Sequence, residues 1–134
     1  MDCIFCKIIA GELPSDKIYE DEEVLAFMDI RPVARGHALV VPKKHSEDLL
    51  TTDDAILDGL LPKVKKIATA VMNGVKADGV NITTNHGAAA GQVVFHLHFH
   101  IIPRIKGDGL KPWQHHDSEP KTRAEIAEAI KQNL

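Results

Sequence analysis

The stretch FHLHFHII at residues 95–102 limits the possible folds of this chain more than any other feature. His96, His98 and His100 alternate in it with apolar residues, and the side chains of a β-strand point to opposite faces in turn. The three imidazoles would therefore lie in a row on one face. The residues that would face the core on the other side are Leu97, Phe99 and Ile101. We expect a long strand over residues 93–103 that holds the row of imidazoles rigidly.

Such a row of imidazoles admits three interpretations. A solvated face is the least favoured, because three of the eight histidines in the chain fall in register. A shared metal ion is a serious alternative, since imidazoles two residues apart on a strand can bind one cation. The preceding loop, NHGAAAGQ, is by itself an ordinary turn, but Gly87 and Gly91 would also let backbone N–H groups approach an anion. Loop and strand together indicate phosphoryl transfer to a histidine.

Four further stretches predict strands, because apolar and β-branched residues in them are bounded by turn residues. These stretches are residues 16–21, 24–30, 37–43 and 80–85. With the histidine strand they indicate an α+β fold whose five-stranded sheet is mostly antiparallel. The composition, 44% hydrophobic and 26% charged, is ordinary for a globular domain of 134 residues.

Helices are predicted before, within and after this set of strands. Asp2 would cap a short first helix, and Gly11 would end it. A long helix with apolar residues three and four positions apart would be capped by Thr52 and kinked at Pro62. A last helix would begin at Thr122, whose spacing to a glutamate fits a capping box.

Charge and hydropathy argue against two classes of partner. The formal net charge of −3 provides no basic surface to attract nucleic acid. No stretch reaches the ~18 apolar residues that a membrane span requires. The first residues also lack the pattern of a signal peptide. We therefore expect a cytoplasmic protein without a nucleic-acid or membrane partner.

The stretch CIFC places Cys3 and Cys6 three residues apart at the start of the first helix. In a reducing compartment they would be thiols or metal ligands and not a disulfide. A redox motif would follow a strand of a βαβ unit, for which there is no room before residue 3. A zinc site needs two more ligands, for which His45 and His96 are the candidates. Two packed free thiols remain the alternative.

Five stretches of the chain resemble the histidine triad (HIT) family. HLHFHII matches its signature His-φ-His-φ-His-φ-φ, where φ is apolar, at all seven positions. This signature lies within the longer matching stretch GQVVFHLHFHIIPR, and the others are DCIFCKIIAGELP, AFMDI and GHALVVPKKH, so that with overlapping pieces counted separately there are five. The resemblance covers roughly residues 2–107 of a single domain over 1–134, leaving a loop and helix at 108–134. It is closest to the branch of nucleoside phosphoramidate hydrolases related to protein kinase C inhibitor-like proteins.

This resemblance implies a fold and a set of roles. The family forms a five-stranded antiparallel sheet and dimerises with two sheets side by side. His98 would attack the α-phosphorus of a nucleotide, His100 would face the phosphate and leaving group, and His37 would support them from behind. Asp29 would hold the ribose hydroxyls. The residues implied around the purine are Phe5, Ile8, Phe27 and Ile30, and those near the phosphate are Asn85, Gly91, Gln92 and the backbone of Val93.

Some family members also bind structural zinc through two cysteines and two histidines, here Cys3, Cys6, His45 and His96. No catalytic metal is required by the implied reaction. The sequence thus predicts a hydrolase that cleaves a purine nucleoside 5′-monophosphate from an amine. The alternatives are a dinucleoside polyphosphate hydrolase, or a nucleotide-binding or zinc-dependent interaction module with negligible turnover. The nucleotidylyltransferase branch is less favoured, because it carries Gln at the position of His100.

Overall fold

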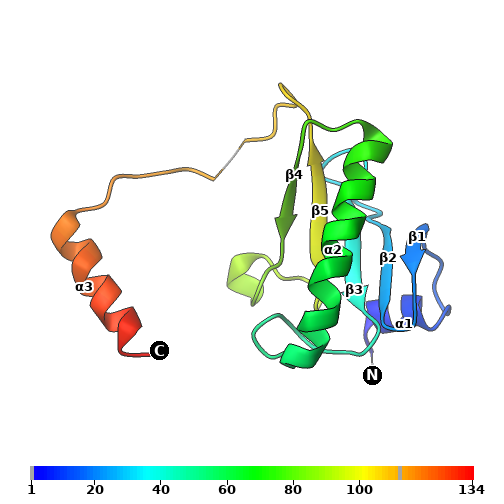
Figure 1. The fold of residues 1–134 in the computed structure, drawn as a ribbon, viewed down its shortest axis with the longest axis horizontal. Coiled ribbons are helices and arrows are strands. Elements are labelled where there is room, and N and C mark those ends of the chain that lie inside the picture. Colours follow the sequence, from blue (N-terminus) through cyan, green and yellow to red (C-terminus); the bar gives the residue numbers. More distant parts are fainter. Residues whose placement is uncertain (1, 112) are drawn as a thin grey trace.

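The computed structural model describes residues 2–111 and 113–134, which form one antiparallel sheet with a long helix on one face (Figure 1). The strands are β1 Lys17–Glu20, β2 Val24–Met28, β3 Ala38–Pro42, β4 Gly79–Thr83 and β5 Phe99–Arg104. The helices are α1 Ile4–Ile9, α2 Asp54–Val75 and α3 Pro120–Lys131, with a 3₁₀ turn at Ala88–Ala90. The strand order is β1-β2-β3-β5-β4, and all neighbours pair antiparallel. The predicted α+β fold is confirmed.

Helix α2 covers one face of the sheet. Its buried residues recur every three or four positions, as expected of an amphipathic helix, and are Leu60, Val64, Ile67, Ala68 and Val71. They pack against inward side chains of β2, β3 and β5, among them Ile101, and against Leu97 just before β5. The helix continues through Pro62, which lies on its exposed side. Proline has no N–H to donate to the carbonyl of Asp58, but water can reach this carbonyl at the surface. The predicted cap at Thr52 is wrong: Asp53 is the N-cap residue, and the Thr52 hydroxyl donates to the carbonyl of Asp48.

Helix α1 lies against the opposite face, where it packs with a second apolar cluster from β2 and β3. The predicted N-cap at Asp2 is wrong. Cys3 is the N-cap, and its sulfur accepts a hydrogen bond from the backbone N–H of Cys6. Asp2 instead pairs with Lys7 on the surface at 3.0 Å. The helix stops before Gly11 as predicted, since this residue has a φ of +78°.

The histidine strand is shorter than predicted, because β5 begins only at Phe99. Val40 faces Phe99 at the end of the β3–β5 ladder, and continuing this register would place Val41 opposite His98 and Pro42 opposite Leu97. Proline has no N–H to donate, and the ladder ends there. The N–H of Leu97 donates instead to the carbonyl of Ser46 at 2.7 Å. The segment that carries His96 is thus anchored outside the sheet.

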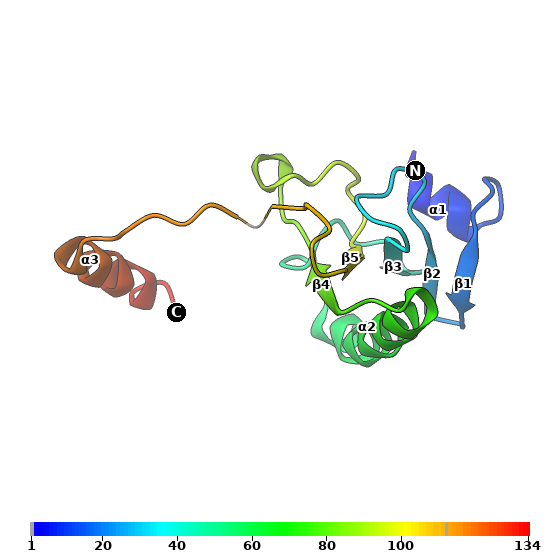
Figure 2. The ribbon, with the colours of Figure 1, turned by 90° about the horizontal axis from the view of Figure 1, so that it is seen from above.

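Helix α3 stands apart from the sheet, at the end of an extended segment (Figures 1 and 2). The helix begins at Pro120 with Glu119 as its N-cap, so the predicted capping box at Thr122 is wrong. Proline favours the first helical position, because the N–H that it lacks would have no partner there. Across the described residues, no helix combines the length and apolar character that a membrane crossing needs.

Candidate active site and metal site

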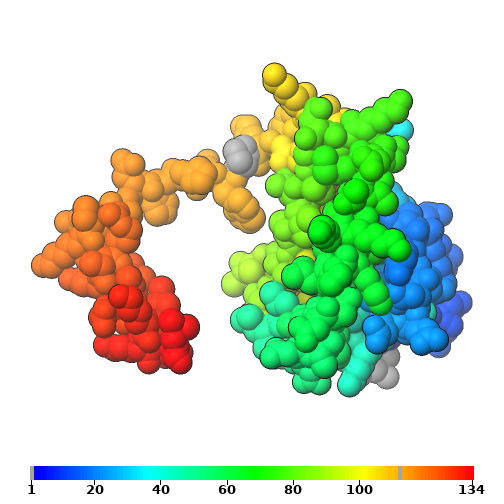
Figure 3. Space-filling view, viewed as in Figure 1, coloured from blue at the N-terminus to red at the C-terminus, as the bar shows by residue number. Residues whose placement is uncertain are grey.

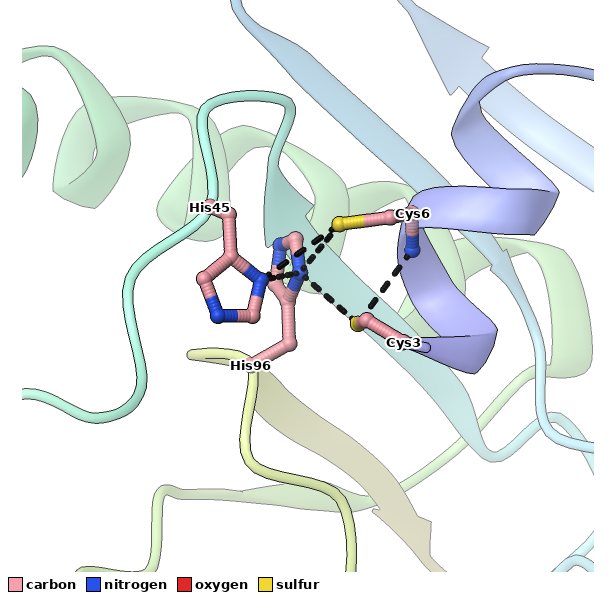
Figure 4. Close-up of side chains that lie close together, drawn as sticks. All are labelled: Cys3, Cys6, His45 and His96. Atoms are coloured by element: carbon pink, nitrogen blue, oxygen red, sulfur yellow. Dashed lines mark hydrogen bonds between the residues drawn. The ribbon is translucent and has the colours of Figure 1, made fainter. Parts of the chain in front are cut away.

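Four side chains from distant parts of the chain meet beside α1 (Figure 4). Nδ1 of His96 lies 3.5 Å from Sγ of Cys3, 3.6 Å from Sγ of Cys6 and 3.1 Å from Nδ1 of His45. Tetrahedral zinc with nitrogen and sulfur ligands separates the ligand atoms by about 3.3–3.8 Å, from its bond lengths of about 2.0–2.3 Å. Two thiols and two imidazoles are a donor set typical of structural zinc. The predicted ligands therefore come together in a geometry that fits this metal.

The tautomer of His96 also suits a metal ligand. Its Nε2 donates to the carbonyl of Pro42 at 2.8 Å, which leaves the lone pair on Nδ1, toward the cysteines. Metal-binding histidines commonly donate their other ring N–H to a carbonyl in this way. Burial lowers the pKa of His96, so its imidazole is neutral near pH 7. The same proline that ends the β3–β5 ladder thus orients a ligand.

His98 lies two residues further on, with the opposite ring nitrogen free. Its Nδ1 donates to the carbonyl of His96 at 2.7 Å, so in the neutral ring the lone pair is on Nε2. The ring of Phe5 packs edge-on against it, at 5.1 Å between centroids. The hydroxyl of Thr84 donates to the carbonyl of His98 at 2.8 Å and holds this part of the backbone. A rigidly held imidazole with a free Nε2 is the arrangement that a nucleophile requires.

His100 presents a hydrogen instead of a lone pair. The backbone N–H of Val33 donates to Nδ1 of His37 at 3.0 Å, so neutral His37 carries its hydrogen on Nε2. That N–H faces Nδ1 of His100 at 3.0 Å, and the hydrogen of neutral His100 is then on its own Nε2. The ring centroids of His98 and His100 are 4.9 Å apart. A free lone pair and an N–H donor thus stand side by side.

Burial keeps these imidazoles neutral. Desolvation lowers the pKa of His37 and of His98 below the ordinary value of histidine. The pKa of His100 is lowered to about 4. Desolvation is the largest cause, and the nearby imidazoles of His98 and His37 lower the pKa further. The carboxylate of Asp29 opposes these shifts, since its negative charge favours an imidazolium.

Asp29, His37 and His100 are also close enough for their ligand atoms to surround a cation. The hydrogen bond from Val33 makes this a poor metal site. Nδ1 of His37 is already an acceptor, so Nε2 is protonated and has no lone pair for a metal. We conclude that His37 supports His100 through a hydrogen bond, with the carboxylate of Asp29 3.5 Å from the same nitrogen of His37. The family resemblance implied that His37 lies behind the triad, whereas its position in the sequence alone indicated a turn residue; in the structure its Nε2 lies 3.0 Å from Nδ1 of His100.

The apolar residues expected around a purine divide into two groups. Phe5 and Phe27 are buried in one cluster, with their rings 5.5 Å apart, and Ile8 packs against it. Ile30 is 86% exposed and lies outside that cluster. Asp29 is half-buried: one carboxylate oxygen accepts from the N–H of Arg31 at 2.8 Å, and the other is 3.5 Å from Nε2 of His37.

The glycine-rich loop has the backbone that its sequence suggested, with φ of +87° at Gly87 and +96° at Gly91. The side chain of Gln92 is buried and fully engaged within the protein. Its oxygen accepts from the N–H of Gly87 at 2.8 Å, and its nitrogen donates to the carbonyl of Glu47 at 2.7 Å. Gln92 therefore shapes the loop, and the role expected for it at the phosphate would require breaking these bonds. The neighbouring Val93 is 85% exposed.

A groove of about 610 Å³ runs from His100 toward the segment after β5. Asn85 and Gly91 line it from the loop, as expected for residues near a phosphate. Sequence reasoning missed two other lining residues, Lys111 and Trp113, which follow β5. The signal was a lysine and the only tryptophan of the chain, close together in the stretch assigned to a loop after residue 107.

The chain matches one family model and several known proteins. The model of the HIT domain matches residues 10–107. The protein hit of Bacillus subtilis is 47% identical, in an alignment that covers 99% of this chain and 94% of that protein. An adenylylsulfatase of Arabidopsis thaliana is 45% identical to this chain. The alignment covers 81% of this chain and 55% of the adenylylsulfatase.

Solved structures extend the likeness to three dimensions. A Streptococcus mutans protein superposes with a TM-score of 0.92, at 43% identity, over 98% of this chain and 85% of that one. A Bacillus subtilis HIT protein gives 0.90, at 46% identity, over 100% and 98% of the two chains. A zinc-bound histidine triad protein from Mycobacterium smegmatis superposes with a TM-score of 0.78 at 43% identity. The superposition covers 96% of this chain and 98% of that one. The chain therefore belongs to the HIT domain family.

Proposed function

We propose that the protein hydrolyses adenylated or related purine nucleotide substrates, such as nucleoside 5′-phosphoramidates, through a nucleotide bound covalently to His98. One observation carries this proposal: Nδ1 of His98 donates to the carbonyl of His96, which leaves the lone pair of the neutral ring on Nε2. The homologous adenylylsulfatase supports an adenylyl substrate.

In the first step, Nε2 of His98 would attack the α-phosphorus, and the bond to the leaving group would break. The Nε2–H of His100 would donate to the phosphoryl oxygens or the leaving atom, where negative charge develops. Water would then cleave the phosphorus–nitrogen bond to His98 and release the nucleoside monophosphate. The purine would lie near the cluster of Phe5 and Phe27, which packs beside His98.

The protonation state of His100 bears on the choice of leaving group. With a pKa of about 4, His100 is a hydrogen-bond donor but a poor source of protons at pH 7. An amine must gain a proton as it leaves, whereas sulfate can leave as an anion. A bound phosphate would raise the pKa of His100, since a negative charge favours the imidazolium. The neutral ring nevertheless favours substrates whose leaving group needs no proton.

The proposal is tested by comparing adenosine 5′-phosphoramidate, adenylyl sulfate and a dinucleoside polyphosphate as substrates of the same preparation. We expect turnover of the first two, with a rate for the phosphoramidate that falls as the pH rises from 6 to 9 and a flatter profile for the sulfate. Nucleotide binding without turnover of any of the three would contradict hydrolysis and favour a binding module. Fastest turnover of the polyphosphate would favour the alternative hydrolase.

We further propose that Cys3, Cys6, His45 and His96 hold one structural zinc ion. Four protein ligands leave no open position, so the metal would tie α1 to the ends of β3 and of the histidine segment and would not activate water. The zinc-bound homologue from Mycobacterium smegmatis supports this assignment. His96 would then serve the fold, and the reaction would use His98 and His100.

Asp29 provides a test of ribose recognition. We expect Asp29→Asn to weaken binding of adenosine monophosphate by about 1.5–3 kcal/mol, because a charged acceptor for two hydroxyls is lost. Asparagine keeps an oxygen that can accept from the N–H of Arg31, so the turn should persist. The effect is measured by calorimetric titration of the wild type and of Asp29→Asn with adenosine monophosphate and with 2′,3′-dideoxyadenosine monophosphate, which lacks both hydroxyls. An equal loss for both ligands would show that Asp29 does not contact the ribose.

A further inference from the structure

The proposed metal site and the proposed nucleophile have a common neighbour, Phe5. This residue lies between Cys3 and Cys6 in the chain, and it is the one residue of α1 that is buried. The centroid of its ring is 6.0 Å from that of His96 and 5.1 Å from that of His98, and both contacts are edge-on. A single side chain of α1 thus packs against a metal ligand and against the residue that would attack the substrate.

The same ring belongs to the apolar cluster beside which the purine would lie. Phe5 packs edge-on against Phe27, with 5.5 Å between the ring centroids. Aromatic rings attract one another beyond the effect of the area that they bury, and the base of a nucleotide is such a ring. Ribose and phosphate would instead be bound by Asp29 and by the glycine-rich loop, neither of which belongs to α1. A displacement of Phe5 would therefore weaken binding of the base and spare binding of the ribose phosphate.

Two links join the metal ligands to His98, and they differ in how far they depend on a metal. The first is the carbonyl of His96, which accepts from Nδ1 of His98 at 2.7 Å. The imidazole of His96 is fully buried, and its Nε2 donates to the carbonyl of Pro42 at 2.8 Å, so contacts within the protein hold this link. The second link is the ring of Phe5, whose position depends on α1.

Helix α1 has few other contacts that would fix it. It has six residues, and so short a helix is not stable alone in water. In the space-filling view the first part of the chain, in blue, lies at the edge of the domain (Figure 3), and Ile8 and Ile9 of α1 are only half-buried. Cys3 and Cys6 point from the start of the helix toward two histidines of other segments (Figure 4). A bound metal would fasten α1 at this point, and its loss would release the helix together with Phe5.

We propose that Phe5 is a positioning residue that couples metal binding to nucleotide binding. The metal holds α1, α1 holds the ring of Phe5 against His98 and Phe27, and the base of the nucleotide packs there. This role rests on the purine substrate and the zinc ion proposed above. Coupling between two sites is reciprocal, so the nucleotide tightens the metal by the same factor by which the metal tightens the nucleotide. The chain would thus bind its substrate strongly only when it carries the metal.

A titration of zinc against a competing chelator measures this coupling without turnover. We expect adenosine monophosphate to lower the dissociation constant of zinc about tenfold, and ribose 5-phosphate, which lacks the base, to change it less than about twofold. Chelated wild-type protein should bind adenosine monophosphate more weakly by the same factor that separates the two zinc constants. Cys3→Ser/Cys6→Ser, which lacks two metal ligands, should bind the nucleotide as weakly as the chelated wild type.

Phe5→Ala separates the coupling from the two binding events, because it removes the ring and keeps every metal ligand. This variant should still bind zinc, but adenosine monophosphate should no longer affect the zinc constant. If Phe5→Ala does not bind zinc, Phe5→Leu, which keeps the apolar cluster filled, takes its place. Ile4→Ala is the matched control, since Ile4 belongs to the same helix and is 47% exposed, and it should keep the coupling.

The outcomes separate this role from the proposed hydrolysis, because both measured quantities are binding constants. Equal zinc affinity of the wild type with and without adenosine monophosphate would overturn the role of Phe5. Coupling that survives in the zinc-binding Phe5 variant, or an equal effect of ribose 5-phosphate, would overturn it too. Coupling without turnover of any substrate would support it and contradict only the hydrolysis.

Discussion

Replacing His98 with asparagine is expected to reduce turnover by about four to six orders of magnitude, as for other enzymes that lose their nucleophile. Asparagine can still donate to the carbonyl of His96, so the local backbone should keep its course while the attacking nitrogen is lost. Nucleotide should therefore still bind. Steady-state kinetics measures the rate, and calorimetric titration with adenosine monophosphate measures the binding.

The proposed covalent intermediate provides a second measurement of the effect of His98→Asn. Wild-type protein that is acid-quenched during turnover should gain the mass of one nucleotidyl group, and His98→Asn should gain none. His86→Ala serves as the control, because this histidine is exposed and its Nδ1 contacts the carboxylate of Asp48 at 3.0 Å. Turnover by His98→Asn within tenfold of wild type would eliminate the proposed nucleophile.

Removal of the proposed zinc is expected to lower the unfolding temperature by roughly 10 °C. The metal would stabilise the fold by about 4 kcal/mol at a free concentration a thousandfold above its dissociation constant. A change of 1 kcal/mol shifts the midpoint of a domain of this size by about 2–5 °C. Helix α1 has only six residues, so its amides should exchange faster once the metal has gone. Chelation followed by calorimetry and hydrogen exchange measures both effects.

Acid should produce the same loss as chelation, because protons compete with zinc for thiolates and imidazoles. The double variant Cys3→Ser/Cys6→Ser is the control, since its midpoint should already be low and should not respond to chelator. Elemental analysis of protein purified without added metal decides occupancy. Less than about a tenth of an equivalent of zinc per chain, with no rise in midpoint when zinc is added, would leave the two cysteines as ordinary thiols.

Much of the architecture follows from local patterns. Alternation in HLHFHII predicted that Leu97 and Ile101 face the core, and both are buried against α2. This holds although β5 is shorter than expected, because an extended chain alternates its faces whether or not it is paired. The ends of elements were less predictable. Three capping residues were placed wrongly, since several neighbouring polar side chains can satisfy the same backbone groups and packing selects among them.

The sequence by itself determined the family, the strands and the residue types of the site, because these depend on periodicity and on a motif of adjacent residues. Tertiary structure alone decided which histidine nitrogens are free. His96 and His98 both donate to backbone carbonyls, but through opposite ring nitrogens, so the lone pair is on Nδ1 of His96, toward the cysteines, and on Nε2 of His98. Those carbonyls are positioned by the end of β3 and by the bend before β5. No spacing along the chain records such a choice, because it depends on where each backbone oxygen lies in space.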